Sequence, residues 1–126
     1  MFNHIIIIIT IFWIFFLTAL PSNSSTPDPL ILYGNNIHFS IYRNGKNIGD
    51  HNVVFKKNDN GNLIVEVSTI MNIKIFGITI YNFSHSSTAL WNNGKLVNLI
   101  ATTDDDGNIN TFKVEMKNNN LVLFGT

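Results

Sequence analysis

The sequence predicts an all-β domain: an antiparallel meander of about six to seven strands, forming a curved sheet or partial barrel, preceded by an N-terminal hydrophobic helix. Two observations lead to this prediction. From Ile37 onward, apolar and polar residues alternate with the period of two that is typical of strands. Asn-Gly and Asp-Gly pairs interrupt the alternation at intervals, and such pairs supply the positive-φ residues that tight hairpins need. Beyond the leader, no segment shows helical spacing with caps.

The N-terminal segment, residues 1–25, is expected to be a signal peptide or an N-terminal anchor. Residues 5–20 are apolar except for two threonines, and Pro21 ends the run. This run is shorter than the ~20 residues that cross a bilayer as a helix, and it has the length of a signal-peptide core. No Lys or Arg precedes Arg43 and no A-x-A site follows, so cleaved and uncleaved leaders both stay open, with a buried core helix as a weaker alternative. We therefore expect a periplasmic or secreted protein, anchored at its N-terminus if the leader is not cleaved.

Residues 26–36 are rich in turn-forming residues and are expected to form a linker. Its apolar patch, residues 30–32, is a weak candidate for a first edge strand. The β domain is expected to cover residues 37–126. Its candidate strands are residues 37–42, 48–57, 63–75, 78–91, 95–103, 109–117 and 121–124.

Successive side chains of a strand point to alternate faces of the sheet, and we call the face on which a residue lies its face parity. Face parity predicts the loop type of the two hairpins that contain Asn-Gly-Lys. A three-residue loop, with a type I turn and a G1 bulge at Gly45, pairs residue 42 with residue 46. This register brings the apolar residues of both strands to one face, whereas a two-residue loop sets them on opposite faces. The same argument predicts a G1 bulge at Gly94. In this register His38 lies opposite Asp50 and on the other face from His51, so these histidines do not form half of a metal site.

The link between the third and fourth strands carries almost no polar residues. It contains Ile75, Phe76 and Ile78, and Gly77 marks the turn. Hairpin tips normally reach water and carry polar side chains. We therefore expect this tip to be covered by further strands or to close one end of a barrel. The alternative is an apolar mouth for a lipid, or a tip that touches a membrane.

The composition excludes several classes of function. Eight basic and eight acidic residues cancel, and they form no basic stripe, so we expect no nucleic-acid partner. The absence of cysteine excludes thiolate metal sites and cysteine nucleophiles. The acidic run from Asp104 to Asp106 resembles a calcium loop, but Lys113 falls where a bidentate Glu is required, so a solvated turn is expected. We assign no cofactor and no metal.

His51 and His85 fall on apolar faces by parity. We expect buried neutral imidazoles that are hydrogen-bonded to a neighbour. If the strands lie in sequence order, another strand separates the two rings. Two strand spacings of about 4.8 Å are too far for joint metal ligation. We find no triad and no nucleophile elbow, so no catalytic residue is assigned.

Two stretches resemble the motifs of a family of exported bacterial proteins of unassigned function. These are FSIYRNGKNIGDH at residues 39–51 and YNFSHSSTALW at residues 81–91, and the similarity continues through residues 95–106. The resemblance implies a periplasmic, β-rich domain and brings no catalytic residue or ligand with it. Asn82 and Ala89 stand where relatives tend to carry a basic and an acidic residue. Relatives continue with more strands after the position of Phe124, so we expect a domain that is incomplete at its C-terminus, a possible fragment.

We therefore expect a non-catalytic exported protein that binds an apolar ligand, such as a lipid, or an envelope partner. One alternative is a structural or assembly subunit that pairs through an exposed strand edge. Another is an enzyme that uses His51 and His85. Membrane contact is expected through the N-terminal segment. The residues expected at a ligand site are His51, His85, Tyr81, Phe83, Trp91 and Phe76.

Overall fold

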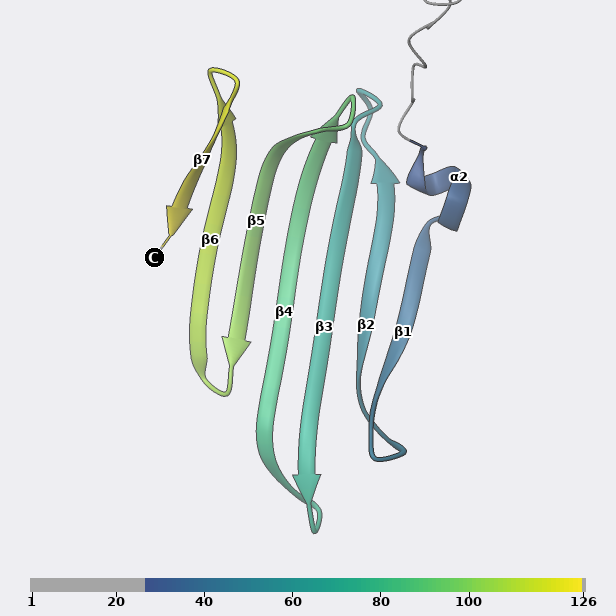
Figure 1. Ribbon diagram of the computed structural model, residues 1–126, viewed down its shortest axis with the longest axis vertical. Helices are drawn as coiled ribbons and strands as arrows, with labels where there is room; N and C mark the ends of the chain where they lie inside the picture. Colours follow the sequence, from purple (N-terminus) through teal and green to yellow (C-terminus); the bar gives the residue numbers. More distant parts are fainter. Residues whose placement is uncertain (1–26, 126) are drawn as a thin grey trace, which may run out of the picture.

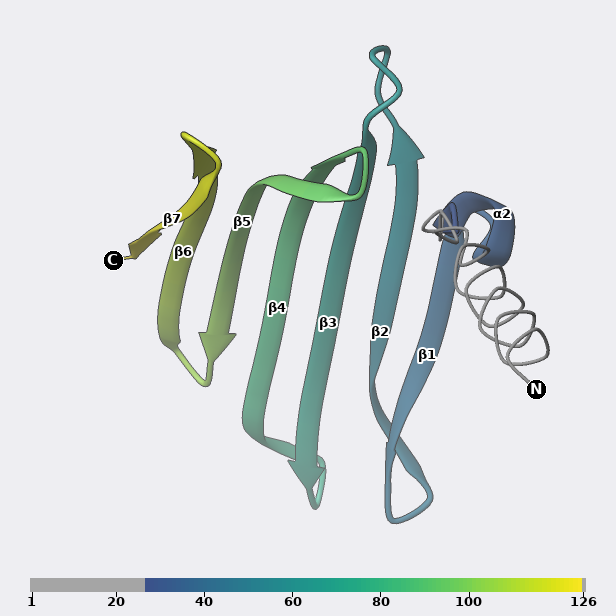
Figure 2. The same cartoon turned by 45° about the horizontal axis from the view of Figure 1, so that its top comes forward.

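The computed structural model describes residues 27–125, which form one seven-stranded antiparallel sheet with a short helix before it (Figure 1). Each strand pairs with its sequence neighbours, in the order β1-β2-β3-β4-β5-β6-β7. The predicted meander is confirmed, and the sheet is curved but not closed into a barrel (Figure 2). The elements are α2 (Pro29–Tyr33), β1 (Asn36–Arg43), β2 (Lys46–Lys57), β3 (Leu63–Ile75), β4 (Ile78–Asn92), β5 (Lys95–Asp105), β6 (Asn108–Lys117) and β7 (Asn120–Gly125).

The expected N-terminal hydrophobic helix lies outside the described residues. Within residues 27–125, no helix is long and apolar enough to cross a membrane.

Helix α2 lies within the predicted linker, and residues 30–32, a weak candidate for an edge strand, belong to this helix. The Asp28 carboxylate accepts a hydrogen bond from the Leu30 backbone N–H at 3.0 Å, and a proline occupies the first turn. These are the standard signals of a helix start, packed into a segment too short to show helical periodicity. Tyr33 then stacks on Phe55, with ring centroids 6.3 Å apart. The helix thereby covers one corner of the sheet.

The predicted type I turns with G1 bulges at Gly45 and Gly94 are wrong. Both loops have two residues with positive φ, because Arg43 pairs with Lys46 and Asn92 pairs with Lys95. Asn followed by Gly adopts this tighter type I′ turn readily. Each returning strand instead contains one unpaired residue after the turn. This extra residue brings the apolar side chains of both strands to the same face.

The register shift places the residues on the faces that parity predicted. In the first hairpin the shift leaves Ile48 without a partner, so Ile41 pairs with Gly49 and Phe39 with His51. His38 lies on the other face from His51, as predicted, but opposite Asn52 and not Asp50.

The sheet has one apolar face and no second layer among the described residues. Along β4 the residues alternate between half-buried and exposed from Tyr81 to Thr88, and the half-buried set shares its face with Phe55 and Ala101. These last two are the only buried hydrophobic residues described, at 8% and 1% exposure. The apolar face includes Ile37, Phe39, Ile41, His51, Val53, Phe55, Leu63, Val65, Val67, Thr69, Met71, Ile73, Tyr81, Phe83, His85, Ser87, Ala89, Trp91, Leu96, Leu99, Ala101, Thr103, Phe112, Val114 and Leu123.

Gly49 is predicted to be irreplaceable in the first hairpin. A Cβ added there would overlap the backbone carbonyl oxygen of Ile70 and lie 2.8 Å from the Met71 Cα. Gly49→Ala should therefore lower the free energy of unfolding by about 2 kcal/mol or more, measured by urea denaturation. Gly125→Ala is the control, since a Cβ there meets nothing within 4 Å. Equal unfolding midpoints for the two variants would contradict the close approach.

Asp28 is predicted to make the sheet's stability sensitive to acid. The hydrogen bond from Lys57, at 2.6 Å, and then that from Leu30 hold the pKa of the Asp28 carboxyl below its usual value. A lowered folded-state pKa stabilises the fold above the unfolded-state pKa, and this stabilisation is lost as pH falls through the folded-state value. As the pH is lowered from neutral to acidic, the urea midpoint should therefore fall less for Asp28→Asn than for the unaltered chain. The Asn side chain keeps the oxygen that accepts the hydrogen bond from Leu30. Parallel pH profiles would rule this contribution out.

Candidate functional site

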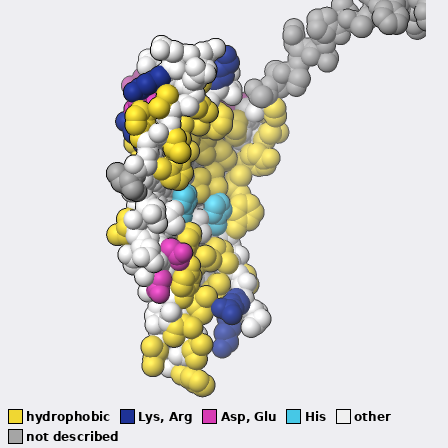
Figure 3. Space-filling model, turned by 60° about the vertical axis from the view of Figure 1, so that its left-hand side comes forward, with side chains coloured by type: hydrophobic (Ala, Val, Ile, Leu, Met, Phe, Trp, Pro, Cys, Tyr) yellow, Lys and Arg dark blue, Asp and Glu magenta, His cyan; other side chains and the backbone are white. Residues whose placement is uncertain are grey.

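A row of four polar residues crosses the centre of the apolar face. The register of β2, β3, β4 and β5 sets His51 opposite Thr69, Thr69 opposite His85, and His85 opposite Thr103. All four side chains are half-buried. The visible histidine side chains lie among hydrophobic ones on the surface (Figure 3). We call these four residues the polar row.

Each histidine of the polar row is hydrogen-bonded to the threonine on the next strand. His51 Nδ1 lies 2.7 Å from Thr69 Oγ1, and His85 Nδ1 lies 2.9 Å from Thr103 Oγ1. The same bond thus occurs twice, two strands apart. With Nδ1 engaged, Nε2 is the ring nitrogen left to donate to, or accept from, a bound group, according to the tautomer. The row therefore offers two similar polar contacts in apolar surroundings.

An open trough of about 1100 Å³ lies on the apolar face beside the polar row. It runs between the β2–β3 loop, the start of α2 and the β4–β5 turn, so its rim is made of Asn, Gly and Pro residues with Lys57 and Asp28. Its size is that of a small-molecule site. Its apolar lining comes from β3, β4 and β5: Leu63, Val65, Val67, Ala89, Trp91, Leu96 and Leu99.

On the other side of the polar row, an acidic turn holds the base of the β3–β4 hairpin. Tyr81 donates to the Asp105 carboxylate at 2.6 Å, and this hydrogen bond raises the pKa of Tyr81 above its usual value. The Asn82 backbone N–H donates to the Asp106 carboxylate at 3.3 Å. The third carboxylate, Asp104, accepts from the Gly107 N–H at 2.7 Å. The acidic run is thus a hydrogen-bonded turn that braces the next hairpin.

The structure brings five of the six predicted site residues to one face. His51, His85, Tyr81, Phe83 and Trp91 all belong to the apolar face, whereas Phe76 lies apart at the β3–β4 turn and is fully exposed. The two histidines stand on alternate strands with Thr69 between them, two strand spacings or about 10 Å apart. Within residues 27–125, no group of three His, Asp or Glu side chains is placed to hold a metal ion.

Sequence reasoning missed the threonine partners and the role of Asp105. The only signal for the threonines is their spacing, since each follows its histidine by 18 residues. That spacing has a meaning only after the register of each hairpin is known.

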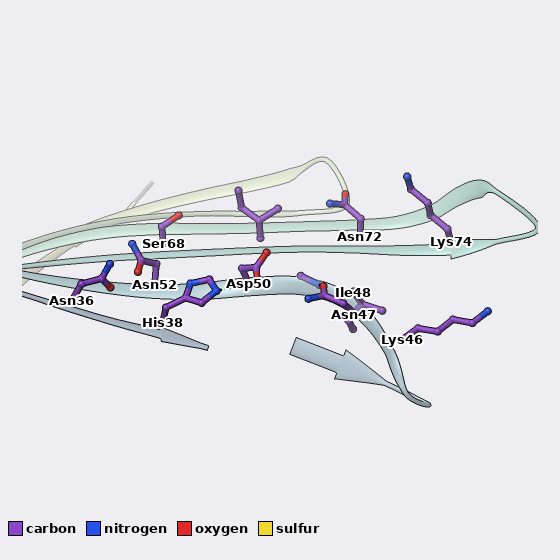
Figure 4. A pocket seen from close by; sticks show the side chains of 12 residues that line it. Asn36, His38, Lys46, Asn47, Ile48, Asp50, Asn52, Ser68, Asn72 and Lys74 are labelled. Atoms are coloured by element: carbon purple, nitrogen blue, oxygen red, sulfur yellow. Dashed lines mark hydrogen bonds and ion pairs between the residues drawn. The ribbon is translucent and has the colours of Figure 1, made fainter. Parts of the chain in front are cut away.

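A second hollow, of about 750 Å³, lies on the opposite face over β1, β2 and β3 (Figure 4). Its side chains are mostly polar and are spread along the strands instead of converging on one point. His38 Nε2 lies 3.4 Å from the Asp50 carboxylate, which also accepts a hydrogen bond from Ser40 at 3.2 Å. The Asn52 Oδ1 atom is shielded from solvent and has no partner. The aliphatic side chains that line this hollow are Ile48 and Ile70 alone, whereas the trough has seven apolar residues from β3, β4 and β5.

Removing the threonine hydroxyls should disturb the histidines without unfolding the sheet. Thr69→Val and Thr103→Val keep a β-branched side chain but leave one ring nitrogen unpaired, at a cost of about 1 kcal/mol each. The imidazole ¹⁵N chemical shifts of His51 and His85, respectively, should change in each variant. Thr88→Val, on the exposed face of β4, is the control and should leave both rings unchanged. Unaltered imidazole shifts in the first two variants would contradict the hydrogen-bonded row.

Comparison with known proteins assigns the chain to a family. A family model described as a domain of unknown function, DUF6134, matches residues 39–125. The matched range includes the polar row and most of the sheet, and it agrees with the resemblance to a family of unassigned function. No curated protein and no solved structure shows significant similarity. Because the match covers well over half of the sequence, the chain belongs to the DUF6134 family.

Proposed function

We propose that this protein binds an elongated amphipathic ligand, a lipid-like molecule with an acyl chain and a polar group, on its apolar face. The acyl chain lies in the trough beside Val67, Ala89 and Trp91, and the polar group meets the imidazoles of the polar row. The adjacency of trough and row carries the proposal. Such a site has the composition of small-molecule sites generally, an apolar lining with a few placed polar groups.

The energetics favour occupancy of this face. A monomer rarely leaves a large contiguous apolar patch in water. In the described residues the sheet has no second layer, and large side chains such as Phe39 and Leu123 stay 55% and 68% exposed. Each methylene group of an acyl chain that leaves water contributes about 0.8 kcal/mol. A long chain can therefore cover much of the trough and supply the free energy of binding at the same time.

The polar row sets the chemical class of the ligand. A purely hydrocarbon ligand would leave the two Nε2 atoms covered and without partners, at a cost in free energy. A carboxyl, hydroxyl or phosphate group would satisfy them. We therefore favour a ligand with one polar end over a fully apolar one. The action we propose lies outside the cytoplasm, supported by the apolar run at residues 5–20.

Assembly through a strand edge is the second candidate. Strand β7, with the sequence NLVLFG, is an edge strand without a charged residue, and Leu121, Leu123 and Phe124 are exposed on it. Unpaired, uncharged edges are templates for pairing with another chain. Catalysis by His51 and His85 is less well supported, since the two rings do not converge.

Ligand binding is tested by native mass spectrometry of the full chain expressed in a bacterial periplasm. Co-purified lipid is expected with the unaltered protein and with Thr88→Asp, whose side chain lies on the opposite face. Ala89→Asp places a carboxylate in the trough and should weaken binding at least about a hundredfold. Urea denaturation midpoints of both Asp variants are measured to confirm that the variants are folded. A stable oligomer without lipid would favour edge pairing, and equal lipid retention by both Asp variants would refute the proposed site.

A further inference from the structure

The turn at the tip of the β3–β4 hairpin breaks a rule that the other tight turns of the sheet obey. Five hairpins have two-residue loops in which both residues have positive φ. At the first position four of them carry Asn or Asp, residues that tolerate the left-handed region. The β3–β4 hairpin carries Phe76 there, with φ +50°. A bulky side chain in this conformation is strained, so the fold gains nothing from a phenylalanine at this position.

The strained phenylalanine is also the most exposed apolar residue described. Phe76 is 100% exposed, and its neighbours Ile75, Ile78 and Ile80 are each at least half exposed. The expectation that further strands cover this tip is not met within residues 27–125. The hairpin extends beyond its neighbours, because β2 stops pairing with β3 at Met71 and β5 stops pairing with β4 at Phe83. An apolar point therefore projects from the end of the sheet (Figure 1).

Unpaired positive charges surround this point. Lys74 lies on the projecting ribbon, and Arg43 and Lys46 flank the neighbouring β1–β2 turn at the same end of the sheet (Figures 1 and 4). Among the described residues, none of the three is paired with a carboxylate. Arg43 and Lys46 stand directly opposite each other, an arrangement of like charges that destabilises a hairpin. Lys and Arg side chains lie next to the apolar tip in the space-filling view (Figure 3).

The acidic turn of β5–β6 does not cancel this charge at the tip. The acidic turn reaches the hairpin at Asn82, whose N–H donates to Asp106, whereas Lys74 pairs with Thr79. Three residues of β4, or about 10 Å at the rise of a strand, therefore separate Lys74 from the acidic turn. This distance exceeds the Debye length of about 8 Å at physiological ionic strength.

We infer that the β3–β4 tip docks on an anionic lipid surface, with Phe76 and its flanking isoleucines entering the interface and Lys74, Lys46 and Arg43 facing the head groups. The combination of an exposed aromatic, aliphatic neighbours and unpaired cations is that of an interfacial membrane anchor. A protein partner fits less well, since a standard protein interface uses roughly 20 residues on each side and the ribbon offers only a few. This site is separate from the trough, and it stands whether or not a ligand binds there.

A fluorescent probe on the full chain tests the proposal. The protein has no cysteine, so Thr79→Cys gives one labelling site near the tip, and Asn92→Cys gives a matched site at the other end of β4. Each is labelled with an environment-sensitive dye and mixed with vesicles that carry spin-labelled lipid. One set of vesicles is phosphatidylcholine, and the other also contains phosphatidylglycerol. We expect quenching at Thr79→Cys in the anionic vesicles and little at Asn92→Cys.

Substitutions in the Thr79→Cys background separate docking from folding. Phe76→Asn restores the preferred turn residue, so it should raise the urea midpoint while reducing tip insertion about tenfold. Lys74→Gln should reduce insertion about fivefold in anionic vesicles only. Ile109→Asn, which removes an exposed apolar residue from β6, should leave insertion unchanged. The N-terminal segment is identical in all variants and does not affect the comparison.

Three results with vesicles would overturn the inference. These are absent quenching at the tip, equal quenching at both ends of β4, and tip insertion that Phe76→Asn leaves unchanged. A dye response that depends on protein concentration without vesicles would assign the tip to contact between copies of the chain, and would also overturn it.

Discussion

One extra residue, three positions after the turn glycine, decides which side chains share a face in this sheet. Three hairpins contain it, and the unpaired residues are Ile48, Ile80 and Val97. Because successive side chains in a strand point to opposite faces, a shift of one residue exchanges the faces of the whole returning strand. Without these shifts the apolar residues of neighbouring strands would be divided between two surfaces. The apolar face, the polar row and the trough all depend on this local irregularity.

The single-layered sheet leaves that face to be covered by something other than the described residues. Ordinary domains bury the apolar side of a sheet against a second layer. Within residues 27–125 only a corner is covered, where Tyr33 of α2 stacks on Phe55. Elsewhere the face presents a trough with a polar row at its side. A lipid-like ligand is the occupant that we propose for this surface, because the polar row can bind its polar group. Pairing at the β7 edge would extend the sheet and would leave this face uncovered.

Two features of the chain cost stability and serve no purpose in folding. Phe76 occupies a left-handed position that the other two-residue turns give to Asn or Asp, and Arg43 opposes Lys46 across the adjacent turn. Both lie at the same end of the sheet. Residues that destabilise the fold and cluster in one place commonly mark a functional surface. The trough and the tip thus divide the molecule into a ligand-binding face and a membrane-facing end, by our proposals.

The sequence by itself determined the strands, their order and the residues of the apolar face, because a period of two and Asn-Gly turns are local signals. It also placed His51 and His85 on apolar faces. Tertiary structure alone decided where each bulge falls, since a three-residue loop and a two-residue loop with a later bulge give the same parity. The pairing of His51 with Thr69 and of His85 with Thr103 followed from that register. Helix α2 also escaped prediction, because five residues are too few to show helical periodicity. Its packing against β2 is a contact between segments that are separated in the sequence.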